Sequence, residues 1–109
     1  MTAPREEIRQ RLLFIDRTIF HAVRACGSDA SVPSELKDCV KRMCQCSSQA
    51  QQAWRSFDEH GMRETVDDLA RISDEAQTRL HPYDGMNYEL KSAVILTHIE
   101  LSALQYQLA

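Results

Sequence analysis

The chain has 109 residues, of which 27% are charged, and a net charge of −3 at pH 7. This length suffices for one hydrophobic core but not for two, and the acidic balance argues against a nucleic-acid ligand held by phosphate neutralisation. Three glycines, three prolines and 6% aromatic residues are few for the tight turns of an all-β fold, so the composition favours an all-α class.

No apolar run reaches the ~20 residues of a membrane span, and the opening residues MTAPREEIRQR are too charged for a secretory signal peptide. We therefore expect a cytoplasmic protein that binds no membrane. In such a compartment the four cysteines are expected as free thiols or ligands rather than as a disulfide frame.

Apolar residues recur in alternating steps of four and three along three predicted helices, as expected when each helix buries one stripe. The first is predicted over about 4–26, from Pro4 to a stop at Gly27, with the stripe Ile8, Leu12, Ile15, Ile19, Ala22 and Cys26. The second is predicted over about 34–60, closed by Gly61, with the stripe Leu36, Val40, Met43, Ser47, Ala50, Trp54 and Phe57. The third is predicted over about 63–80, with the stripe Met62, Val66, Leu69, Ile72, Ser73, Ala76 and Leu80.

The fourth predicted helix, 87–108, is apolar on nearly all sides. After the breaker cluster 81–85, Asp84 or Asn87 is expected to cap it. One face carries Leu90, Val94, Thr97, Leu101, Leu104 and Leu108, and the opposite side carries Tyr88, Ile95, Ile99 and Tyr106 with Leu96 beside them. A helix of this kind is normally buried on both sides. One face can cover the chain's own core, and the other then needs a neighbour.

Four helices with short links predict one domain over residues 1–109, folded as an antiparallel up-down-up-down four-helix bundle. In that topology the first and fourth helices are neighbours, so surplus apolar residues of both helices can form one surface. The predicted partner-binding residues are Leu13, Phe14, Phe20, Ile95, Leu96, Ile99 and Tyr106. The expected partner is a second copy of the chain in a two-fold dimer, and another protein remains open.

The cysteines and histidines allow a second hypothesis, a bundle that binds a metal ion or a small ligand. On one regular helix Cys39 and Cys46 stand about 10.5 Å apart along the axis, and Cys44 points away from both. A metal site would therefore need Cys or His side chains from several helices. The simpler interpretation is that Cys39 and Cys46 pack beside the core, and we predict neither a metal nor a cofactor.

His21 raises a third hypothesis, because it is followed by the basic Arg24 and the small Ala25. This order is similar to the H-x-x-K-G pattern of histidine phosphotransfer domains, which are also acidic four-helix bundles. The resemblance implies phosphorylation of His21 and covers only these few residues. It departs from the pattern in having Ala25 in place of glycine and in placing His21 near the end of its helix.

No set of residues in the sequence matches a known catalytic arrangement. There is no Gly-rich phosphate loop, no nucleophile elbow and no matched pair of carboxylates. Asp16 interrupts an apolar flank, where it is either a functional carboxylate or, more commonly, the partner of an arginine. We therefore predict a protein that is not an enzyme.

Overall fold

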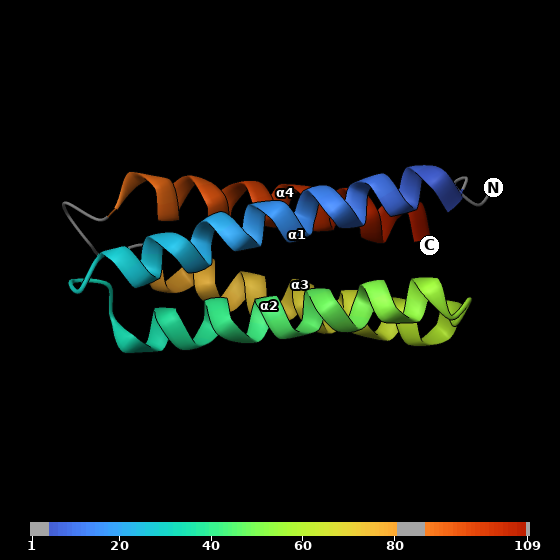
Figure 1. Cartoon of the computed structure of the whole chain (residues 1–109), viewed down its shortest axis with the longest axis horizontal. Helices are drawn as coiled ribbons and strands as arrows, with labels where there is room; N and C mark the ends of the chain where they lie inside the picture. Colours follow the sequence, from blue (N-terminus) through green and yellow to red (C-terminus); the bar gives the residue numbers. More distant parts are fainter. Residues whose placement is uncertain (1–4, 81–86, 109) are drawn as a thin grey trace.

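The computed structural model describes residues 5–80 and 87–108. Within them the chain forms α-helices and no strand: α1 (Arg5–Ser28), α2 (Ser34–Arg55), α3 (Glu59–Leu80) and α4 (Tyr88–Leu108). The helices lie side by side along one long axis (Figure 1). α1 packs against α2 and α4, and α3 packs against the same two helices. The fold is therefore all-α, with four helices around one compact core.

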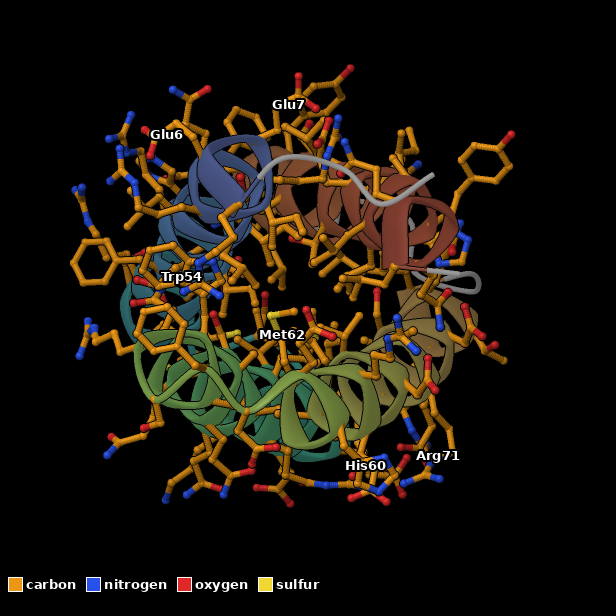
Figure 2. The ribbon with its side chains drawn as sticks, turned by 90° about the vertical axis from the view of Figure 1, so that its right-hand side faces the viewer. Glu6, Glu7, Trp54, His60, Met62 and Arg71 are labelled. Atoms are coloured by element: carbon orange, nitrogen blue, oxygen red, sulfur yellow. The ribbon has the colours of Figure 1, made fainter. Side chains whose placement is uncertain are left out.

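The core is built from the predicted stripes. Those of α1 and α3 are buried along their whole length, and the buried face of α4 is the predicted one with Ala93 added. Seen along the helices, Met62 points into the centre, whereas Glu6, Glu7 and Arg71 point away from it (Figure 2). The alternating steps of four and three thus locate the buried side of each helix.

α2 ends earlier than the sequence predicts, at Arg55 rather than near residue 60. The Phe57 N–H donates to the Trp54 carbonyl (3.2 Å) and the Asp58 N–H to the Ala53 carbonyl (2.9 Å), which is the Schellman pattern that closes a helix. Phe57 occupies the left-handed position with φ 58°, where glycine is usual. Phe57 was predicted to belong to the core stripe, but it lies beyond the helix and is 73% exposed.

α3 begins at Glu59 instead of residue 63 because Asp58, and not Gly61, marks the boundary. The Asp58 carboxylate accepts the Gly61 N–H (2.9 Å), as an N-cap residue does. Gly61 therefore lies in the first turn of α3 and does not close α2. Gly27 likewise does not end α1, which continues to Ser28.

α4 starts at the second of its two predicted caps. The Asn87 side-chain oxygen accepts the Leu90 N–H (3.1 Å), which satisfies one of the free donors at the start of the helix. Asp84, the other predicted cap, lies outside the described residues, as does Pro4.

Polar contacts join neighbouring helices at defined heights. Between α1 and α4, Arg11 donates to Glu100 (2.6 Å) and to Gln107 (2.8 Å). Near the opposite end of the same pair, His21 lies 3.9 Å from Glu89. Residues early in α1 therefore meet residues late in α4, and residues late in α1 meet residues early in α4.

The same relation holds between α2 and α3, where Arg42 pairs with Glu75 (3.2 Å) and Arg79 pairs with Glu35. It holds between α3 and α4, where Gln105 donates to Asp67 (2.9 Å) and His98 lies 2.9 Å from Asp74. Each contact joins two residues at the same level along neighbouring helices. These contacts add directional interactions to the non-directional packing of the core.

Candidate protein-interaction surface

α4 differs from α2 and α3 in the side that it turns away from the core. We define its outer face as Tyr88, Ile95, Leu96, Ile99 and Tyr106. Tyr88 is 81% exposed, Tyr106 85% and Ile99 55%. Among the described residues of α2 and α3, no large hydrophobic side chain is exposed. α4 thus packs into the core with one side and exposes a second apolar surface on the other.

The structure places the four predicted residues of α4 on this surface, with one difference of degree. Leu96 is 39% exposed and, as Ile99 and Tyr106 are, available to a partner. Ile95 is half-buried and packs against the edge of the core. Tyr88 was not among the predicted partner-binding residues. The periodicity that marks Ile95 and Ile99 also places Tyr88 on this side, so the signal for it was present in the sequence.

The three predicted residues of α1 are exposed but do not lie together. Phe14 lines a shallow groove of about 370 Å³ between α1 and α4, facing Leu96 across it. Arg17, His21 and Glu89 also line this groove. Phe14 therefore extends the outer face of α4 onto the neighbouring helix.

Leu13 lies on the other flank of α1. It lines a cavity of about 150 Å³ between α1 and α2, together with Gln51 and Trp54. Phe20, seven residues further on, shares this flank of the helix and is 56% exposed. The structure thus brings Phe14 to the α4 surface and leaves Leu13 and Phe20 on the side nearer α2.

The end of α2 holds a contact that the sequence did not reveal. The Arg5 guanidinium stands 4.4 Å from the centre of the Trp54 ring and 4.2 Å from that of Phe57, within the range of cation–π attraction. The same guanidinium donates to the Trp54 carbonyl (2.9 Å). This contact covers one side of the exposed Phe57 ring and ties the start of α1 to the end of α2.

The four cysteines are free thiols. Cys39 is buried and Cys46 is half-buried against the core, in agreement with their interpretation as packing residues. Burial raises the pKa of the Cys26, Cys39 and Cys46 thiols above the ordinary value. Each of the three is therefore held as a neutral thiol, which is a poor nucleophile and a poor metal ligand.

We expect iodoacetamide to alkylate Cys26 and Cys39 slowly in the folded chain at about pH 8 and rapidly once urea unfolds it. Because their pKa is raised by folding, the neutral thiols stabilise the fold below the ordinary thiol pKa, and this contribution is lost as the pH rises through the folded-state value. Peptide mass spectrometry after timed alkylation measures the effect site by site. Equal rates in native buffer and in urea would show that neither thiol is protected.

Asp16 forms a hydrogen bond with a residue of the neighbouring helix α2. Its carboxylate accepts a hydrogen bond from the hydroxyl of Ser47 on α2 (3.0 Å), and no arginine pairs with it among the described residues. His21 is exposed and lies edge-on to the Phe20 ring. Ala25, about one turn after His21 in α1, is buried.

Within residues 5–80 and 87–108, no three His, Cys, Asp or Glu side chains are grouped as a metal ion would require. None of the described helices is long and apolar enough to cross a membrane. Comparison with protein-family models, with curated proteins and with solved structures gave no match.

Proposed function

We propose that this chain is a non-enzymatic interaction protein that associates with a second copy of itself through the outer face of α4. The observation that carries the proposal is the second apolar side of α4, with Tyr88, Ile99 and Tyr106 each more than half exposed. A patch of adjoining apolar side chains on a small protein usually marks an interface. A two-fold dimer is the commonest closed assembly that buries such a patch.

We also infer the antiparallel up-down-up-down topology for the four helices. Its support is the set of polar contacts between neighbours, such as Arg11 with Glu100 and His21 with Glu89. In each neighbouring pair, early residues of one helix meet late residues of the next. α1 and α4 are then adjacent antiparallel helices, which is why Phe14 can adjoin the outer face of α4.

A reducing compartment such as the cytoplasm fits the four free cysteines, since thiols persist there without forming disulfides. Cys44 and Cys46, both on α2 and partly exposed, are the thiols that an oxidising medium would reach first.

Two other functions can each be tested directly. A metal- or ligand-binding bundle that recruits Cys or His from several helices predicts metal retained through purification, which elemental analysis detects. A phosphotransfer domain predicts that a small phosphodonor labels His21, and labelling that persists in His21→Gln would dispose of it. Within residues 5–80 and 87–108 no group of three potential ligands supports the first function. The Glu89 carboxylate near His21 (3.9 Å) does not favour the second, because a carboxylate repels a phosphoryl group.

The contribution of α1 to the proposed surface can be mapped with two matched variants. We expect Phe14→Glu to weaken dimerisation by about tenfold, since it brings a carboxylate beside Leu96 and costs on the order of 1 kcal/mol. Phe20→Glu adds the same charge on the other flank of α1 and should change the dissociation constant less. Sedimentation equilibrium of the two variants side by side measures both values. A larger loss for Phe20→Glu would move the interface to the α2 side of α1.

A further inference from the structure

The outer side of α4 carries its residue types in a regular order. Six of its residues follow one another in steps of four, three, four, three and four, and each of them is exposed or half-buried. They are Tyr88, Ser92, Ile95, Ile99, Ser102 and Tyr106. We call these six residues the seam. Read in either direction the order is Tyr-Ser-Ile-Ile-Ser-Tyr, and its midpoint falls at Thr97. The steps are those by which two helices pack along their length at a shallow angle.

We propose that two copies of the chain pack their seams antiparallel, about a two-fold axis that passes at the height of Thr97. This inference rests on the proposed self-association and assigns its geometry. Residues at equal distances from Thr97 then face each other across the axis: Tyr88 meets Tyr106, Ser92 meets Ser102 and Ile95 meets Ile99 of the second copy.

The order of residues is informative because parallel and antiparallel packing of the two helices require different things of the sequence. In a parallel pair every residue lies level with its own copy, whatever the sequence. In an antiparallel pair, like residues meet only if the order is the same from both ends. The seam of α4 has the same order from both ends at all six positions. The buried side does not: Ala93 and Leu101, for example, are equally far from Thr97 but differ in type.

Each level of the seam has a suitable chemistry. At the centre, Ile95 and Ile99 of both copies form an apolar layer, and the small serines on either side allow the helices to approach closely. The Ser102 hydroxyl already donates to the His98 carbonyl (3.1 Å), so its donor stays satisfied when the seam is covered. At each end a pair of tyrosines can stack their rings while the hydroxyls remain in water.

The area is sufficient for a specific dimer at the small end of the known range. An aromatic side chain buries roughly 150–250 Å² when it is covered, and Tyr88 and Tyr106 are more than four-fifths exposed. With Ile99 and Leu96 added, each copy would bury roughly 500 Å², or about 1,000 Å² in total, near the lower limit for stable specific interfaces. A second copy of this chain therefore accounts for the seam without any further partner.

Disulfide trapping with Ser92→Cys and Ser102→Cys tests the arrangement. In the antiparallel pair, position 92 faces position 102 of the other copy, while two copies of position 92 lie about 15 Å apart along the axis, beyond the reach of a disulfide. Each variant alone should then give no more covalent dimer than the unmodified chain, which controls for the native thiols. An equimolar mixture should trap roughly half of the dimers, the share of mixed pairs after random exchange.

Light scattering of the same unoxidised samples separates the possible failures. Trapping of most dimers in Ser92→Cys alone, about twice the share trapped in the mixture, would indicate a parallel pair and overturn the antiparallel seam. A doubled mass with no trapping in any sample would place the dimer interface elsewhere and also overturn it. A monomer mass in every sample would contradict the proposed self-association itself, and therefore also the antiparallel packing of the seam.

Discussion

Ile99→Glu should convert the chain to a monomer and leave its helical circular dichroism spectrum unchanged. Ile99 is 55% exposed in the single chain, so a glutamate there stays hydrated and should change the unfolding free energy by less than about 0.5 kcal/mol. In the dimer, each copy would lose the burial of an isoleucine and bring a carboxylate into an apolar layer. The combined cost is on the order of 3 kcal/mol, or roughly a 100-fold rise in the dissociation constant.

Gln49→Glu is the matched control for this variant. It adds the same charge at an exposed position of α2, away from the outer face of α4, and should leave the mass unchanged. Sedimentation velocity of both variants at one concentration gives the comparison. If Ile99→Glu sediments like the unmodified chain, or if both variants dissociate equally, the association does not depend on α4.

Leu101→Ala should have the opposite effect, a loss of stability without a specific loss of association. Leu101 is 1% exposed and lies on the core side of the same helix, so its truncation removes apolar contacts and leaves a cavity. We expect a loss of about 2–5 kcal/mol in unfolding free energy, and hence a fall of roughly 10–25 °C in the melting temperature. This is a large share of the stability of a chain this size.

The measurement is best made in the Ile99→Glu background, where dimerisation no longer adds to the apparent stability. Urea unfolding followed by circular dichroism gives the free energy, and Ser102→Ala on the outer side of the same turn is the control. A loss below about 1 kcal/mol for Leu101→Ala, or an equal loss for the two variants, would mean that α4 is not anchored in the core through this side.

The sequence predicted the buried sides of the helices well because one repeat governs them all. Ile15, Leu69 and Leu101 are buried, as the steps of four and three require, and the same steps identified the second apolar side of α4. Such a pattern is local to one helix and needs no knowledge of its neighbours. The all-α class followed from it.

The helix ends and the polar contacts were harder to predict, for physical reasons. The end of α2 depends on Phe57 in a left-handed conformation, which an aromatic residue does not signal as glycine would. Arg42 of α2 pairs with Glu75 of α3, a contact between two helices that the sequence of neither helix indicates. Which flank of one helix meets which flank of the next cannot be read from either helix alone.

The candidate surface was predicted in part for the same reason. The apolar excess of α1 was visible in the sequence, but the division that sends Phe14 toward α4 and Leu13 toward α2 depends on how the helices are placed around the core. Asp16 shows the limit most plainly. Its partner is Ser47 on another helix, a pairing that no spacing within α1 could indicate.

The most direct test of the central claim is the mass of the unmodified chain in solution, measured by light scattering across a dilution series. Self-association through the outer face of α4 predicts twice the 12.5 kDa chain mass at concentrations on the order of tens of micromolar, falling toward the single-chain mass on dilution. A mass of one chain throughout that range would contradict it.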